Sequence, residues 1–248
     1  MTASTTLAAR ARRGSETAGR NTEELKAIVS HVGAELELAP AEDIIEWAVA
    51  TFGARFCVTS SMSDAVLSHL ASRVAPGVDV VFLDTGYHFA ETIGTRDAVA
   101  ATLSVTLIDI APAQSVAEQD AAYGKDLFLR DPDLCCALRK VQPLARGLVE
   151  YDAWATGLRR AETHNRVIAP VVGWDEKKQK VKVSPLARWS DKDVDAYVAE
   201  HHILINPLHH DGYPSIGCWP CTRRVAPGED SRSGRWSGSQ KTECGIHQ

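Results

Sequence analysis

The feature that most constrains this chain is the alternation of short apolar runs with helix-like segments. Three runs have the length and the β-branched content of buried strands: "RFCVTS" at 55–60, "VDVVFL" at 78–83 and "VTLIDI" at 105–110. The stretches 64–74 and 88–102 between them are helical in pattern. Strands joined through helices run parallel and require cover on both faces. We therefore expect an α/β fold with a parallel sheet and helices on both faces.

Further elements extend this pattern on either side. Residues 21–36 predict a helix with Asn21 as its cap and Glu24 three residues later. A second helix is expected over 41–53, from Pro40 to Gly53. Downstream we predict a proline-interrupted helix over 131–148, a strand at the start of "AWATGLRR", a hairpin around "DEKKQK" and a helix over 191–203 capped by Ser190.

The chain has six cysteines, and their spacing is unusual. Cys57 lies inside a predicted strand, where a cysteine behaves as a small buried hydrophobe, and we assign it no role. Cys218 and Cys221 form a C-x-x-C, typical either of a redox dithiol or of half a metal site. A redox pair is expected where a helix follows a strand, whereas this one lies in an irregular region rich in Gly and Pro. This position in the chain therefore favours a metal site over a redox pair.

Cys135 and Cys136 are adjacent, which strains a disulfide but lets two thiolates reach different atoms of one metal cluster. Together the two pairs supply four thiolates, the set that holds a [4Fe–4S] cluster. A four-cysteine zinc site is the alternative, although both pairs in such sites are usually spaced by two residues or more. Unligated thiols are the third reading.

Cys244 remains, close to the end of the chain in "KTECGIHQ". Arg232, Arg235 and Lys241 are near it in sequence, and nearby cations raise the thiolate fraction of a cysteine. We interpret the tail as the carrier of a nucleophile. An incidental terminal thiol is the alternative.

Polar loops follow several predicted strands. Ser60, Ser61 and Ser63 lie where a helix begins, a position suited to a phosphate or sulfate group. The next strand is followed by Asp84, Thr85 and Gly86, and a later one by Arg159 and Arg160. Ligands of open α/β sheets bind at the carboxyl ends of the strands, so we predict a cleft for an anionic ligand there.

Six segments in order, "SSMSDAVL", "LDTG", "CCALRK", "GLRRAET", "GCWPCT" and "ECGIH", resemble those of the adenylyl-sulfate (APS) reductases of assimilatory sulfate reduction, relatives of the PAPS reductases. The resemblance covers about residues 50–248. It implies an adenine nucleotide α-hydrolase-like fold. The ATP pyrophosphatases of that fold carry S-G-G-x-D-S, whereas "SSMSDA" lacks the glycines, which weakens any prediction of ATP cleavage.

The resemblance implies a role for each unusual residue. The [4Fe–4S] ligands would be Cys135, Cys136, Cys218 and Cys221. Lys140 would lie between cluster and substrate, and adenylyl sulfate would be held by Ser60, Ser61, Arg159, Arg232 and Arg235. His247 would contact the phosphosulfate; a solvated tail histidine is the alternative. Cys244 would attack the sulfate sulfur, and thioredoxin or a glutaredoxin-like dithiol would resolve the resulting S-sulfocysteine.

Two alternatives stay open: a PAPS reductase, and a zinc-stabilised nucleotide-binding or RNA-modifying enzyme with an incidental Cys244. We expect a disordered arm at 1–20, a nucleotide-binding reductase domain at 21–206 and a loop-rich segment at 207–248 with a mobile catalytic tail. The net charge of −5 argues against a general nucleic-acid binder. The apolar runs are too short for a membrane protein, and a leader without an apolar core favours the cytoplasm over a transit peptide. A homo-oligomer is one option.

Overall fold

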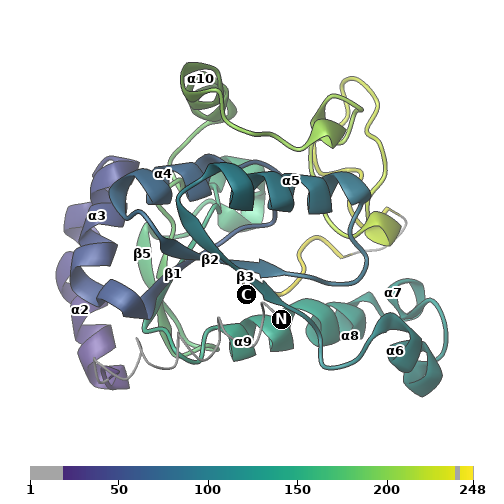
Figure 1. The fold of residues 1–248 in the computed structure, drawn as a ribbon, viewed down its shortest axis with the longest axis horizontal. Helices are drawn as coiled ribbons and strands as arrows, with labels where there is room; N and C mark the ends of the chain where they lie inside the picture. Colours follow the sequence, from purple (N-terminus) through teal and green to yellow (C-terminus); the bar gives the residue numbers. More distant parts are fainter. Residues whose placement is uncertain (1–18, 238–240, 248) are drawn as a thin grey trace.

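The computed structural model describes residues 19–237 and 241–247, so the predicted arm at 1–20 lies almost wholly outside the described residues. A six-stranded sheet in the order β3-β2-β1-β4-β6-β5 forms the centre (Figure 1). The strands are β1 Phe56–Thr59, β2 Val78–Leu83, β3 Val105–Ile110, β4 Ala153–Thr156, β5 Val172–Asp175 and β6 Lys180–Val183. All neighbours pair in parallel except β5 and β6, the predicted hairpin. The expected α/β fold with a mainly parallel sheet is confirmed.

Helices connect the strands. Their bounds are α2 Thr22–Leu36, α3 Ala41–Phe52, α4 Val66–Val74, α5 Ala90–Thr102, α6 Val116–Tyr123, α7 Leu127–Arg130, α8 Pro132–Cys136, α9 Gln142–Gly147 and α10 Asp191–His201. The predicted caps are present, because Asn21 and Ser190 each form a capping box with the residue three positions on. Helices α6 and α7 were not predicted.

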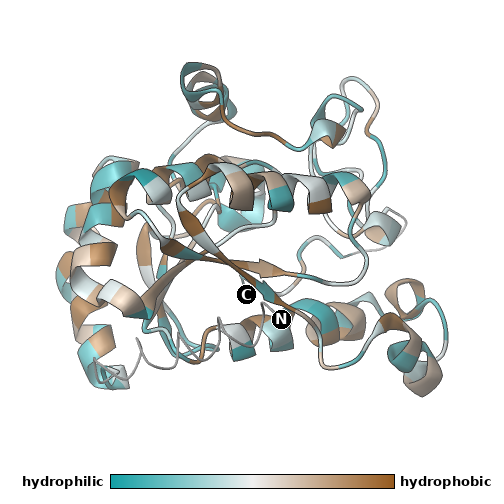
Figure 2. Cartoon of the chain, in the orientation of Figure 1, coloured by the Kyte–Doolittle hydropathy of each residue, from teal (hydrophilic) through white to brown (hydrophobic). Residues whose placement is uncertain are grey.

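Alternate residues of each strand face opposite sides of the sheet, as the two-residue period of a strand requires. Val58 and Phe82 join the large core beneath α2, α3 and α4. Cys57, Val81 and Trp154 point to the other side, where Leu144 and Leu148 complete a smaller core against α9. Figures 1 and 2 show this arrangement, with apolar strands between helical layers. Both faces of the sheet are thus covered by helices, as expected.

The segment 131–148 differs from its prediction. We expected Pro143 to interrupt a helix, whereas α8 continues into the π-helix η2 (Ala137–Val141) and then into α9. Pro143, which lacks an N–H donor, lies at the start of α9 inside this continuous helical segment. The wide π turn lies directly before it. This turn presents Lys140 one turn after the vicinal cysteines.

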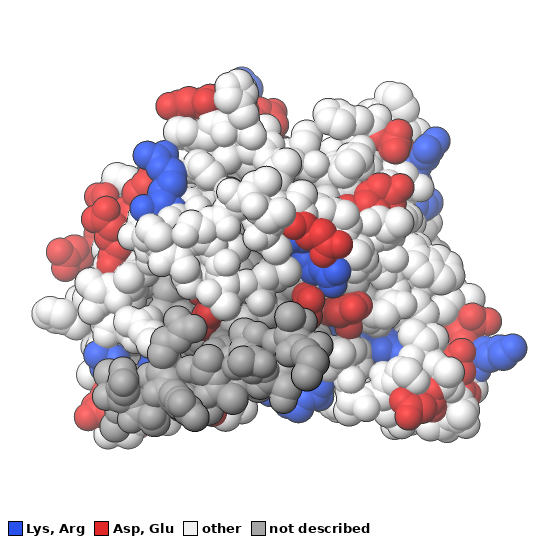
Figure 3. Space-filling model, in the orientation of Figure 1, with Lys and Arg blue, Asp and Glu red and all other residues white. Residues whose placement is uncertain are grey.

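Beyond α10 the chain is irregular, as predicted. The described part has two short 3-10 turns, η5 (Pro207–His209) and η6 (Trp219–Cys221), and a bridge between Thr222 and Arg235. Residues 241–247 then return to the sheet, where Ile246 packs against the core beside α9. Figure 3 shows basic side chains interspersed with acidic ones on one face. Within the described ranges, no helix is both long enough and apolar enough to cross a bilayer.

Candidate active site

A cavity of about 550 Å³ lies at the carboxyl ends of three neighbouring strands. Its wall includes Thr59 at the end of β1, Leu83 at the end of β2 and Thr156 at the end of β4. The last residues of the described chain close it, since Cys244 and His247 also line it. The cavity therefore occupies the position at which open α/β sheets bind ligands.

The structure brings most of the predicted site residues to this cavity. Those that line it are Ser60, Ser61, Thr85, Lys140, Arg159, Cys218, Arg232, Arg235, Cys244 and His247. Asp84 and Gly86 do not line it. The Asp84 carboxylate instead accepts a hydrogen bond from the Gly86 amide at 2.9 Å, and Gly86 has a φ of +71° that favours glycine. These two residues shape the turn that positions Thr85.

The serine loop between β1 and α4 turns sharply. Met62 takes a φ of +58°, uncommon for a residue other than glycine, and its fully buried side chain holds the loop in the core. The Met62 amide donates to Ser60 Oγ at 3.2 Å. The loop therefore has a fixed form at the cavity wall, and the amino end of α4 follows it.

Two further residues, Asp64 and His209, line the cavity and are not predicted from the sequence. Asp64 lies within the quoted "SSMSDA", and burial raises the pKa of its carboxyl although the Val66 amide and His209 oppose this. His209 comes from η5 and places Nε2 2.9 Å from Ser63 Oγ. Burial lowers the pKa of His209. No signal in the sequence indicated that η5 would reach this loop.

Basic side chains concentrate at one end of the cavity. Burial lowers the pKa of Lys140, but negative charge on Cys218 and Cys244 as thiolates outweighs burial and raises it above the usual value. The Arg235 guanidinium lies 4.6 Å from the Trp236 ring centroid and donates to Ile216 O at 3.2 Å. Its Nε is buried and has no hydrogen-bond partner within the described structure. A buried donor without a partner suits an anionic ligand.

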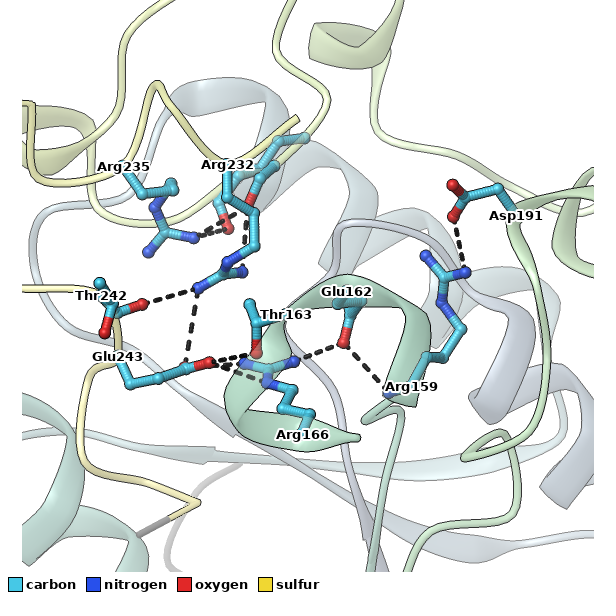
Figure 4. A network of polar contacts seen from close by, with 11 residues as sticks. Arg159, Glu162, Thr163, Arg166, Asp191, Arg232, Arg235, Thr242 and Glu243 are labelled. Carbon is cyan, nitrogen blue, oxygen red and sulfur yellow. Dashed lines mark hydrogen bonds and ion pairs between the residues drawn. The ribbon is translucent and has the colours of Figure 1, made fainter. Parts of the chain in front are cut away.

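Two other arginines are held by acids (Figure 4). Arg159 Nη1 is 2.7 Å from a carboxylate oxygen of Asp191. Arg232 Nη2 donates to the Thr242 carbonyl at 3.2 Å and lies 3.6 Å from Glu243 Oε2. Arg232 therefore contacts the tail directly.

The two cysteine pairs meet beside the cavity. Cys135, Cys136 and Cys218 are buried, and Cys221 is half-buried. Burial and the neighbouring Cys136, Cys218 and Cys221 raise the pKa of Cys135 to about 12. Burial raises that of Cys136 to about 11 against the charge of Lys140. Within the described ranges, no three or more His, Cys, Asp or Glu side chains are arranged to hold one metal ion.

The tail is docked rather than solvated. His247 stacks on Trp154 with the ring centroids 6.2 Å apart and the planes at 4°, and burial lowers its pKa well below the usual value. Gly245 turns the chain immediately after Cys244, with a φ of +81°. Cys244 is therefore held at the cavity between Glu243 and Ile246.

Comparison with known proteins agrees with this geometry. The model of the phosphoadenosine phosphosulfate reductase domain matches residues 55–224. An adenosine 5′-phosphosulfate reductase of Streptomyces coelicolor is 66% identical over 228 residues, covering 92% of this chain and 97% of that protein. One of Mycolicibacterium smegmatis is 53% identical over 224 residues, covering 90% and 95%.

Solved structures give the same picture. A phosphoadenylyl-sulfate (PAPS) reductase of Candida auris in a phosphate complex has a TM-score of 0.67 at 29% identity, covering 77% of this chain and 94% of that one. An FMN adenylyltransferase of Candida glabrata, at 10% identity and a TM-score of 0.52 over 81% of this chain and 74% of its own, shares the fold alone. The resemblance seen in the sequence is confirmed. This chain belongs to the phosphoadenosine phosphosulfate reductase domain family and, within it, to the adenosine 5′-phosphosulfate reductases.

Proposed function

We propose that this protein reduces adenosine 5′-phosphosulfate to sulfite and AMP. One observation carries the proposal: a cysteine on a docked tail and several cationic side chains line one cavity at the carboxyl ends of the strands. The relatives at 66% and 53% identity are named for the same reaction. The neighbour at 29% identity is a PAPS reductase, so the preference for the 3′-unphosphorylated nucleotide rests on the higher identities.

The cavity suggests an orientation for the nucleotide. The serine loop and the amino end of α4 suit the 5′-phosphate, with Ser60 and Ser61 as donors. Lys140, Arg232 and Arg235 then face the sulfate end of the same phosphosulfate group, on the side where Cys244 lines the cavity. In this proposal residues 21–206 form the nucleotide-binding domain, and the segment 207–248 supplies two arginines and the nucleophile.

The chemistry balances with Cys244 as the only protein group that changes covalently. Its thiolate attacks the sulfate sulfur, an S–S bond forms, and the bond from sulfur to the phosphate oxygen breaks to release AMP. The cationic groups offset the charge that develops on the leaving phosphate. One thiolate of a dithiol then attacks Cys244 Sγ and releases sulfite, and its second thiol frees Cys244 as the dithiol becomes a disulfide. The dithiol supplies both electrons.

A protein dithiol is the reductant this cycle requires. The four clustered cysteines are buried or half-buried beside the cavity, and we assign them to a metal centre rather than to electron supply. We therefore propose thioredoxin, or a glutaredoxin-like protein, as the partner. Such reductants are kept reduced in the cytoplasm, which is the location we propose.

The cysteine pairs suit a [4Fe–4S] cluster. Four thiols that oppose one another's ionisation require positive charge to become thiolates together, and an iron–sulfur cluster supplies it. A four-cysteine zinc site usually spaces both of its pairs by two residues or more, and the adjacent Cys135 and Cys136 do not have that spacing. Arg139 is buried nearby, with Nε and Nη2 lacking hydrogen-bond partners in the described structure. When bound, the cluster would supply a fixed charge distribution beside Lys140.

Two measurements on anaerobically purified protein test these assignments. Sulfite formation with thioredoxin should be much faster from APS than from PAPS, and the reverse preference would contradict the proposed substrate. Iron and acid-labile sulfide should each be about four per chain. Stoichiometric zinc without sulfide would instead support the zinc-stabilised alternative. Cys135→Ser should lose iron, whereas Cys57→Ser should retain it.

A further inference from the structure

The residue before the proposed nucleophile is an acid that the tail buries. Glu243 is 8% exposed, although it lies five residues from the end of the chain. Its carboxylate accepts two hydrogen bonds from one guanidinium, from Arg166 Nε at 2.9 Å and from Arg166 Nη2 at 2.8 Å. Thr163 Oγ1 lies 3.4 Å from the same carboxylate. The two parallel hydrogen bonds from Arg166 to Glu243 are the bidentate geometry that makes arginine–carboxylate contacts strong and directional (Figure 4).

All three guanidinium nitrogens of Arg166 donate to carboxylates. Its remaining nitrogen, Nη1, donates to Glu162, and Glu162 also accepts from the Arg159 amide at 3.1 Å. Arg166 lines the cavity, yet each of its three nitrogens already faces a carboxylate. It differs in this from Arg235, whose Nε has no partner in the described structure. Arg166 is therefore arranged to bind the tail rather than the substrate.

The tail is also held on the other side of Cys244. Lys178 Nζ donates to the Ile246 carbonyl at 2.8 Å, and Lys182 Nζ lies 3.5 Å from the His247 carbonyl oxygen. The Ile246 side chain packs against the core beside α9. Cys244 thus sits between two anchors, an ionic one at Glu243 and a mixed one at residues 246–247.

We propose that Glu243 and Arg166 form a latch that positions the tail, and with it Cys244, over the cavity. Both are positioning residues, because they act through Cys244 and not on the substrate. Attack by an oriented thiolate gains rate from proximity, so loosening the tail should slow adduct formation. This inference rests on the proposed function.

The latch is suited to repeated opening. A buried ion pair returns both charges to water when it separates, so its hydration offsets much of the attraction that is lost. The tail can therefore hold Cys244 firmly during attack and still release it to a protein dithiol. An apolar anchor of similar area would lack this compensation.

The test compares Glu243→Gln, Arg166→Met and the double variant with wild type. In a single turnover with APS and without reductant, each single variant should form the Cys244 adduct about 10- to 100-fold more slowly, as expected for losing a charge-assisted pair. The double variant should form the adduct no more slowly than the slower of the two single variants, because both changes remove the same interaction. Glu229→Gln, which removes an exposed partner of Arg223 in the same segment, should match wild type.

Two readouts separate positioning from substrate binding. Alkylation of Cys244 by a bulky reagent, mapped by peptide mass, should accelerate about tenfold or more in the latch variants. APS affinity, measured in a Cys244→Ser background, should stay within about twofold after Arg166→Met. A loss of APS affinity equal to the loss of rate, unchanged alkylation, or multiplicative effects in the double variant would overturn the latch. Alkylation needs no APS, so a failure of the proposed function would remain distinguishable.

Discussion

Replacing Lys182 by Met should stabilise the protein and weaken its activity. Lys182 lies on β6, facing the α9 side of the sheet, with its ammonium 5.5 Å from the Trp154 ring centroid. Burial, only partly offset by Asp175, lowers its pKa from 10.5 to about 8. A shift of this size corresponds to an upper limit of about 3 kcal/mol for holding the charged form in the fold.

The expected gain is smaller than this limit, because the ammonium is still partly solvated. We expect Lys182→Met to raise the free energy of unfolding by about 1–2 kcal/mol at pH 7, which for a chain of this length is about 3–6 °C in Tm. The folded pKa lies below the unfolded one, so the cost of the charged lysine is fully present below about pH 8. This cost disappears as the pH rises from about 8 to 10.5. The stability gained by Lys182→Met over wild type should therefore be about a third to a half smaller at pH 9 than at pH 7.

Thermal unfolding at pH 7 and pH 9, together with sulfite formation, checks this prediction. Sulfite formation should fall about two- to tenfold, because the His247 carbonyl loses its contact with Lys182. Lys180→Met is the matched variant: Lys180 lies two residues away on β6 and its ammonium is 3.5 Å from the Val149 carbonyl oxygen, so sulfite formation should be retained. The reasoning would be refuted if Lys182→Met were less stable than wild type, or if it were more stable by the same amount at pH 7 and pH 9.

Two further changes probe separate parts of the molecule. Asp152→Ala removes a buried carboxylate and leaves the partly exposed Arg55 without its partner at 2.8 Å, so chemical unfolding should show a loss of about 3 kcal/mol. A loss below about 1 kcal/mol would show that water replaces the carboxylate. In Gly217→Ala an added Cβ would overlap the Arg235 guanidinium and displace it from the cavity. The Kd for APS, measured in a Cys244→Ser background, should therefore rise about 10- to 100-fold while the iron content stays unchanged. An unchanged Kd would remove Arg235 from the proposed site.

Much of the architecture could be predicted because its signals are local. The strands of a sheet covered on both faces appear as continuous apolar runs, and the caps Asn21 and Ser190 lie directly before their helices. The cysteine spacing stood out for a similar reason, since adjacent cysteines are rare. Local order does not specify how a helix turns, so the sequence predicts a break at Pro143 and does not predict the π-helix Ala137–Val141.

The missed parts of the site depend on contacts between distant segments. Glu243 meets Arg166 across 77 positions, and neither residue is unusual in its own surroundings. Lys178 and Lys182 belong to a polar stretch that predicts a hairpin, but not that the tail would lie on its lysines. Asp84 was placed in the site because it follows a strand. Its hydrogen bond to the Gly86 amide holds it in the turn instead.

The central claim is that Cys244 carries the sulfur during the reaction. Wild-type protein incubated with APS in the absence of a reductant should gain the mass of one SO3 group, located by peptide mapping on the peptide that holds Cys244. Cys244→Ser should keep its iron and its APS binding but gain no such mass, because a hydroxyl is scarcely ionised at neutral pH. An adduct on Cys57 or on one of the four clustered cysteines, or sulfite formation by the serine variant, would contradict the account.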